Sequence, residues 1–195
     1  MADYTAIYET GNAIVEILRD AMTPEPVSKR EMIAMCSPYE PDNNQLTVHL
    51  YHVEKDTQFE SPSFRPAGPN KMEMSPTVIN AYYLVTAHSQ APLQVREADM
   101  YRVLGAAMQA IADMPTISKQ YLNGSLASEQ ANIHLEIENN DFEKMMKIWN
   151  NTQTPYKPSV VVKATGVEIS SKRTKKISRV MDAEITVEQK AQGIR

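Results

Sequence analysis

The chain has 195 residues, of which 42% are hydrophobic and 23% charged, with a single cysteine and a net charge of −4. This length is sufficient for a hydrophobic core without covalent cross-links, and one cysteine excludes a disulfide framework within the chain. No apolar run approaches the roughly 20 residues that a membrane-spanning helix needs. We expect a protein without a secretory signal or membrane anchor that folds in the reducing cytoplasm.

The first third of the chain is predicted to hold one helix and one strand. Apolar residues recur at helical spacing over residues 2–22, which predicts a helix with Asp3 as its N-cap. Prolines and asparagines predict irregular backbone over residues 27–44. Residues 45–54 are rich in β-branched and aromatic side chains and predict a strand. Residues 56–76 contain four prolines and a glycine, so we expect a long loop that is functional or mobile.

The most informative stretch is residues 77–89, which are rich in β-branched and aromatic residues and contain neither glycine nor proline. The odd-numbered positions are mostly apolar, and the even-numbered positions are mixed. This pattern is typical of a central strand that is covered on both faces. Residues 156–162 have the composition of a late partner strand in the same sheet.

The next predicted element is a helix over residues 97–114, because apolar residues recur at helical spacing until Pro115. The expected buried stripe of this helix consists of Tyr101, Leu104, Met108 and Ile111. Residues 131–138 alternate between apolar and polar, which predicts a strand with one solvated face. A short helix is expected to start at Asn140.

The C-terminal part is predicted to contain a strand over residues 160–169, a basic turn over 170–176 and a returning strand over 177–187. Together the elements predict an α+β fold, a single domain in which helices flank a mixed central β-sheet. We expect a core domain over residues 1–170 and a basic hairpin or tail over residues 171–195.

Charge is unevenly distributed along the chain. Residues 157–195 contain nine Lys/Arg and four Asp/Glu, a net charge of +5, so the preceding residues carry −9. A basic end on an acidic body is typical either of a solvated tail or of a segment that binds an acidic partner. Nucleic acid is the weaker choice of partner, because aromatic side chains do not interleave with the basic ones and the body would repel phosphates.

Motifs for catalysis or metal binding are missing from the sequence. There is no phosphate-binding glycine loop, dinucleotide fingerprint or nucleophile elbow. His49 and His52 are three positions apart on a predicted strand and should face opposite sides, so they are not expected to share a metal ion. Cys36 is expected to fill space rather than to react. We therefore predict a non-enzymatic protein with no catalytic, cofactor-binding or metal-binding residues.

Four segments of the chain carry a resemblance to a known family. They are residues 7–18 (IYETGNAIVEIL), 45–54 (QLTVHLYHVE), 80–88 (NAYYLVTAH) with 101–108 (YRVLGAAM), and 148–149 (IW) with 154–160 (TPYKPSV). In their order and spacing they are similar to the cap proteins of extracellular contractile injection systems, the phage-tail-like particles of the antifeeding-prophage and Photorhabdus-virulence-cassette kind.

This resemblance implies a structural role and a fold similar to phage tail terminators. Family members form a six-subunit ring on the end of the particle away from the baseplate, where they close the inner tube and contact the last layer of sheath. Some larger relatives carry an additional C-terminal domain, and this chain is expected to be the core domain alone. The alternatives are another ring-forming adaptor of the same particle, or a nucleic-acid-binding module that uses the basic end.

Two regions are candidates for contact with other subunits. Aromatic and basic residues on the long loop either contact a partner or fold back on their own domain, and the basic end could meet an acidic tube or sheath surface. The candidate partner-binding residues are Phe59, Phe64, Arg65, Lys172, Arg173, Lys175, Lys176 and Arg179. We hypothesise that residues 160–169 and 177–187, or the loop over 59–74, add strands to unpaired edges of the sheath.

Overall fold

The computed structural model describes residues 3–58, 63–129, 131–139, 142–150 and 154–177. The helices are α1 (Ala6–Met22), η1 (Arg30–Met32), α2 (Leu93–Asp113), η2 (Lys119–Tyr121), α3 (Gly124–Glu129) and α4 (Phe142–Asn150). The strands are β1 (Ile33–Ala34), β2 (Leu46–Lys55), β3 (Phe64–Pro66), β4 (Lys71–Met74), β5 (Thr77–Ala87), β6 (His134–Ile137), β7 (Ser159–Ile169) and β8 (Thr174–Lys176).

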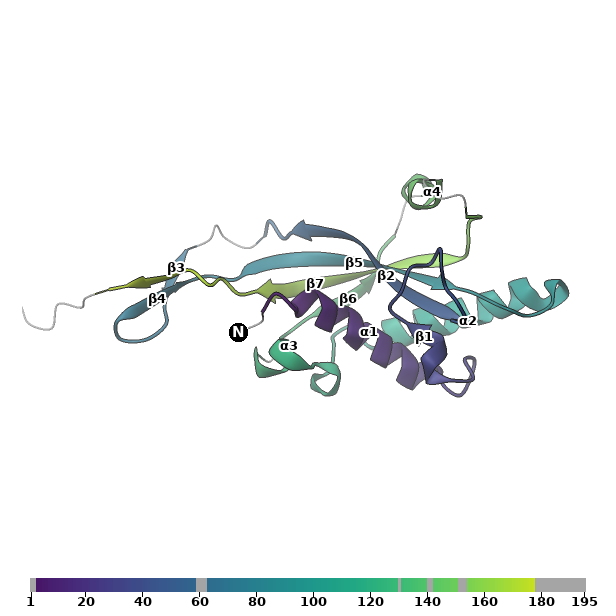
Figure 1. The fold of residues 1–195 in the computed structure, drawn as a ribbon, viewed down its shortest axis with the longest axis horizontal. Coiled ribbons are helices and arrows are strands. Elements are labelled where there is room, and N and C mark those ends of the chain that lie inside the picture. Colours follow the sequence, from purple (N-terminus) through teal and green to yellow (C-terminus); the bar gives the residue numbers. More distant parts are fainter. Residues whose placement is uncertain (1–2, 59–62, 130, 140–141, 151–153, 178–195) are drawn as a thin grey trace, which may run out of the picture.

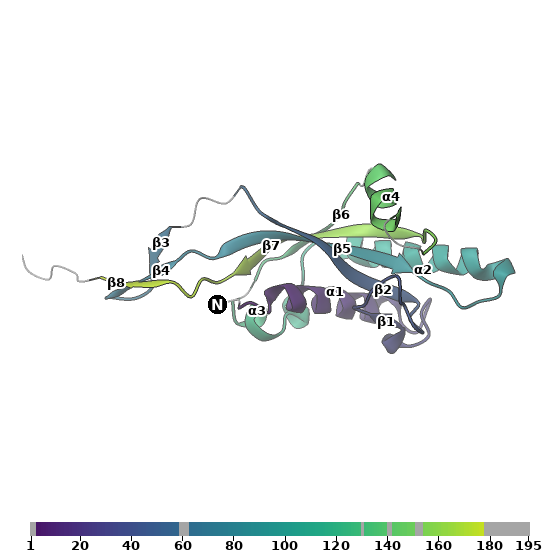
Figure 2. The same cartoon turned by 45° about the horizontal axis from the view of Figure 1, so that its top comes forward.

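A five-stranded sheet in the order β1-β2-β5-β7-β6 forms the body of the molecule (Figure 1). Its neighbouring strands are antiparallel, except for β1, which runs parallel to β2. The helices α1 and α2 lie on one side of the sheet and α4 on the other (Figure 2). The predicted α+β fold with a mixed central sheet between helices is therefore confirmed.

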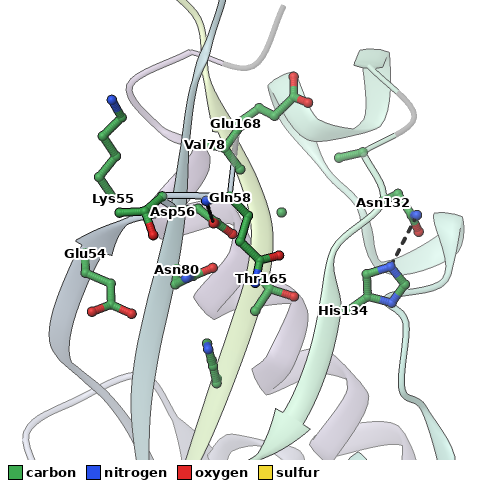
Figure 3. Close-up of a pocket in the computed structure, with 14 residues that line it drawn as sticks. Glu54, Lys55, Asp56, Gln58, Val78, Asn80, Asn132, His134, Thr165 and Glu168 are labelled. Carbon is green, nitrogen blue, oxygen red and sulfur yellow. Dashed lines mark hydrogen bonds between the residues drawn. The ribbon is translucent and has the colours of Figure 1, made fainter. Parts of the chain in front are cut away.

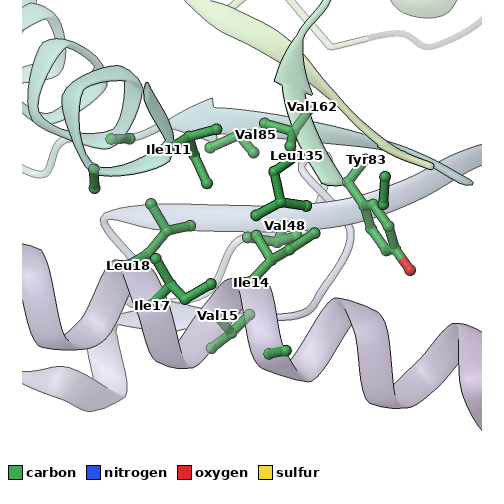
Figure 4. Close-up of a cluster of buried hydrophobic side chains, with 14 of the residues drawn as sticks. Ile14, Val15, Ile17, Leu18, Val48, Tyr83, Val85, Ile111, Leu135 and Val162 are labelled. Atoms are coloured by element: carbon green, nitrogen blue, oxygen red, sulfur yellow. The ribbon is translucent and has the colours of Figure 1, made fainter. Parts of the chain in front are cut away.

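The strand β5 lies at the centre of the sheet, as its sequence predicts, with the expected late partner β7 on one side and β2 on the other. Every residue of β5 after Thr77 is buried. Tyr83 and Val85 face the main core, which they share with Ile14 and Leu18 of α1 (Figure 4). Burial on both faces explains why β5 reads as a nearly continuous apolar run.

A second, smaller cluster fills the space between the sheet and α4. Its buried members are Tyr82, Leu84, Met145, Trp149 and Val161. The ring of Tyr39 packs edge-on against Trp149, with 5.4 Å between the ring centroids, and its hydroxyl donates to the carbonyl of Ile148 at 3.1 Å. This cluster holds α4 on the face of the sheet opposite α1.

Both long helices begin at positions other than those predicted. The helix α1 starts at Ala6, and Asp3 is not its N-cap, because Thr5 occupies that position without a side-chain capping bond. The helix α2 starts at Leu93, directly after Pro92. Proline tolerates the position just before a helix, where no backbone donor is needed.

The predicted buried stripe of α2 is wrong by about a quarter turn. Tyr101 is 60% exposed and Met108 is 38% exposed, whereas Met100, Val103 and Ala107 are buried. Leu104 is half-buried against the core, and Ile111 is buried as expected. Apolar residues occupy two neighbouring sides of this helix, so spacing alone did not distinguish the side that meets the sheet.

Two local features departed from the sequence rules. A bulge interrupts the pairing of β2 with β5 between Leu50 and His52, so the strict alternation behind our argument about the two histidines fails. The rings of His49 and His52 contact Tyr39 and Tyr82, which both belong to the cluster under α4. The short elements β1 and α3 were not predicted, because two and six residues carry too little periodicity.

The predicted long loop and basic turn together form a second sheet, which we call the arm. Its strands β3, β4 and β8 pair antiparallel in the order β3-β4-β8. Figures 1 and 2 show the arm projecting beyond the body along the longest axis of the molecule. The loop prediction for residues 56–76 and the turn prediction for 170–176 are therefore both corrected, because the two segments pair with each other.

Candidate functional site

The arm continues the two central strands of the body. Only Ser75 and Pro76 separate β4 from β5, and four residues separate β7 from β8. The amide of Met74 donates to the carbonyl of Arg173 at 3.1 Å, and the amide of Ile177 donates to the carbonyl of Asn70 at the same distance. The proline-rich composition that predicts a loop is compatible with this short sheet, since its prolines lie outside β4, the middle strand.

One face of the arm is apolar. Residues directly opposite in an antiparallel pair share a face, and successive residues alternate. The register pairs Phe64 with Met74, and Pro66 with Met72. In the next strand Lys175 lies opposite Met72, and the guanidinium of Arg173 lies 3.8 Å from the sulfur of Met74. Two cations therefore border this apolar face.

The other face of the arm is charged. Arg65 lies opposite Glu73, and Lys71 lies opposite Lys176. The ammonium of Lys71 binds the carboxylate of Glu73. Within the described residues, Arg65 and Lys176 have no ion pair, so this face is free to meet an acidic surface.

The structure brings most of the predicted contact residues together. Phe64, Arg173 and Lys175 lie on the apolar face, and Arg65 and Lys176 on the charged face. Lys172 points back toward the body, where its ammonium lies 5.8 Å from the centre of the Tyr4 ring. Phe59 and Arg179 lie outside the described residues, as does the predicted returning strand beyond residue 177.

Part of the strand-addition hypothesis is contradicted by the topology. The strand β7 pairs with β5 on one side, and β6 pairs with residues 162–165 on the other, so this middle part of β7 is not a free edge. In the described part of the chain, β3 and β8 each pair with β4 alone and leave an unpaired outer edge. The hypothesis therefore stays open for the arm and for the end of β7 after Thr165. The division of the chain at residue 170 also stays a prediction.

A polar trough of about 780 Å³ lies near the root of the arm, with Lys55–Gln58 on one side and Asn132 and His134 on the other (Figure 3). Asn80 lies on its floor and is 8% exposed. Nearby, the hydroxyl of Tyr82 donates to the carboxylate of Glu54 at 2.5 Å, and this bond lowers the pKa of Glu54. Sequence reasoning missed the trough, because its residues come from four separate segments.

A buried polar group lies at the other end of β5. His88 is 5% exposed, and its ring nitrogens lie 2.9 Å from the hydroxyl of Thr47 and 3.0 Å from the ammonium of Lys157. Burial, with a smaller contribution from the Lys157 charge, lowers the pKa of His88 to about 4. The imidazole is therefore neutral near pH 7, and both of its ring nitrogens have a polar partner.

The described residues contain neither a metal-binding cluster nor a membrane-spanning helix. No group of three or more His, Cys, Asp and Glu side chains there is arranged to hold a metal ion. None of the helices that the structure describes is long and apolar enough to cross a membrane.

Comparison with solved structures defines the class of fold. The chain is similar to the sheath/tube terminator of the extracellular contractile injection system PVC, solved in its extended state, with a TM-score of 0.68 and 18% identity over 98% of this chain and 66% of that one. It is also similar to the tube-terminating cap of the anti-feeding prophage, with a TM-score of 0.58 and 17% identity over 91% of this chain and 60% of that one. The fold is thus that of tube-terminating proteins.

A match between the sequence and a family model identifies the family of the chain. A family model described as the Pvc16 N-terminal domain matches residues 9–182, and the chain belongs to this family. The resemblance identified from the four sequence segments is thereby confirmed. No curated protein sequence gives a significant match. The chain spans 66% and 60% of the lengths of the two structures that it resembles.

Proposed function

We propose that the chain is a structural, non-catalytic cap protein of a contractile injection particle. In this role it forms a ring, expected to have six subunits, that ends the inner tube and contacts the last sheath layer away from the baseplate. The observation that carries the proposal is the match to the PVC sheath/tube terminator over 98% of this chain, together with membership of the Pvc16 N-terminal domain family. The ring would assemble in the cytoplasm and leave the cell with the particle.

The physical requirement for such a cap is simple. A tube of stacked identical rings exposes at its last ring a surface that fits another copy. A protein that ends the tube must match this surface on one side and differ on the other. Contacts between two different patches of the same chain close into a ring when the rotation between neighbours divides a full turn.

The arm is the part of the fold best suited to reach the sheath. Its outer strands β3 and β8 have unpaired edges in the described residues, and an unpaired edge is a template for strand addition. Its charged face presents Arg65 and Lys176 without ion pairs among those residues. The arm thus combines backbone pairing with a basic surface that would meet an acidic tube or sheath.

The decisive experiment images particles from cells that lack this protein, by negative-stain electron microscopy. Over-long or open-ended tubes, restored to normal length when the protein is supplied again, would support the proposal. Normal length with closed ends would refute it.

A charge-reversed arm tests the role of the basic surface. The variant combines Arg65→Glu with Lys176→Glu and should bind particle ends less tightly, with open ends as the visible result. The control is Lys147→Glu, an exposed lysine on α4, which should leave the ends closed. Equal capping by the arm variant and the control would contradict a contact through Arg65 and Lys176.

A further inference from the structure

The apolar face of the arm is only partly covered, because Phe64, Met72 and Met74 are half-buried and Pro66 is exposed. The arm is a single layer of three short strands, and covering the apolar surface that it leaves in water would stabilise it. The face presents Phe64, Pro66, Met72 and Met74. In Figures 1 and 2 the arm stands clear of the helices, so the helices of the body do not cover the exposed part of this face.

A second uncovered apolar surface lies on α2. Leu93 is 78% exposed, Tyr101 60% and Met108 38%, and their spacing of eight and seven residues places them along one side of the helix. We call this side the outer stripe. With Val95, four of the nine exposed large apolar side chains of the described residues lie on α2, and their concentration on one helix indicates a contact site.

The two surfaces lie at opposite ends of the molecule. Figure 1 shows the arm at one end of the longest axis and the start of α2 at the other. A closed ring built from one kind of chain needs two different, complementary patches that point toward different neighbours. The apolar arm face and the outer stripe meet this requirement.

The charges of the two surfaces are complementary. The apolar arm face is bordered by Arg173 and Lys175 and has no carboxylate among its described residues. On α2, Glu97 lies within the outer stripe and accepts a hydrogen bond from Tyr101. A groove of about 580 Å³ beside the stripe adds the carboxylates of Glu25 and Asp113 against the single cation Arg102.

We infer that the apolar arm face of one copy packs on the outer stripe of α2 in the next copy and closes the ring. The inference rests on the proposed ring and names its subunit interface. Phe64, Met72 and Met74 meet Leu93, Tyr101 and Met108, while Arg173 and Lys175 approach the carboxylates around the stripe. The charged arm face and the strand edges stay free for tube and sheath.

Photo-cross-linking in intact particles tests the contact directly. Phe64 is replaced by p-benzoylphenylalanine, which keeps the aromatic ring, and purified particles are irradiated. We expect a ladder of cross-linked copies of this chain, with the linked peptide mapping to residues 93–113 of another copy. Cross-links only to tube or sheath protein, or no ladder, would overturn the inference. The same replacement at Tyr8, which is also 60% exposed, should give no ladder.

A mixing experiment tests whether the two patches are different. Met72→Lys should disable the arm and Tyr101→Lys the outer stripe, so each variant alone should be monomeric. An equal mixture keeps one intact patch of each kind and should form dimers of twice the monomer mass, measured by light scattering. Rings formed by either variant alone would contradict the interface, and so would an equal mixture that stays monomeric.

The two proposals fail in different ways. If Phe64 links to the sheath while deletion of the protein leaves tubes open, the interface is wrong and the cap function stands. If deletion leaves particle ends normal, the cap function is wrong, whatever the cross-links show.

Discussion

Acid should destabilise this protein through His88. The side chain is buried between Thr47 and Lys157, and its pKa is lowered from 6.5 to about 4. Below the ordinary pKa the unfolded chain binds a proton that the folded chain does not, so stability falls as pH drops. The loss begins near pH 6.5 and is complete once the pH is below the folded pKa.

The size of the effect follows from the two pKa values. Between about pH 7.5 and about pH 4.5, linkage predicts a loss of about 2.5 kcal/mol from this one group. Since a domain has a total stability of about 5–15 kcal/mol, the loss is a substantial part of it. Carboxylates that bind in the folded state add their own acid sensitivity, so the His88 contribution must be measured as a difference.

The measurement compares the wild-type protein with His88→Gln by urea unfolding at several pH values. Glutamine can still donate to Thr47 and accept from Lys157, but it does not titrate. Trp149 is the only tryptophan and is 2% exposed, so its fluorescence reports unfolding. The difference in unfolding free energy between the two proteins should change by about 2.5 kcal/mol across this range. A difference that does not change with pH would refute the assignment.

Two further predictions concern local structure. Gly124 has a positive φ of 56°, and a Cβ there would collide with the Glu9 carboxylate. The variant Gly124→Ala should therefore have a free energy of unfolding about 1–3 kcal/mol lower, measured by thermal unfolding. A Cβ at Gly105 on α2 has open space around it, so Gly105→Ala should stabilise the protein by about 0.5–1 kcal/mol. Equal changes in stability for the Gly124 and Gly105 variants would contradict this prediction. Val103→Ala should destabilise by about 1–3 kcal/mol and Met108→Ala by less than about 0.5, measured on dilute protein. The reverse order would mean that the predicted stripe of α2 is the buried one.

The strands of the sheet could be predicted wherever the residues of one segment alone have the composition and alternation of a strand. Residues 77–89 have no breaker and are apolar at most positions, and residues 78–87 are the buried part of β5. The strand β6 alternates and has one exposed face, as expected. These elements can be predicted from their own residues, because the order of apolar and polar side chains shows whether one or both faces are buried.

The arm could not be predicted in the same way. Its strands have three or four residues, and β4 pairs with a segment about a hundred residues later in the chain. Phe64, Arg65 and the basic residues were recognised as contact candidates one by one. Their division into an apolar and a charged face depends on a register that only the paired strands reveal. The outer stripe of α2 was misread as core for a related reason, since exposed and buried apolar sides look alike in sequence.

The continuity between β4 and β5, and between β7 and β8, has a mechanical consequence. A pull on the tip of the arm passes along two strands that run side by side through the centre of the body. Force in that direction pulls β5 and β7 the same way, so it loads in shear the hydrogen bonds that join them to β2 and β6, rather than breaking these bonds one after another. The arm therefore transmits axial load into the central strands β5 and β7 instead of peeling away from the surface of the body.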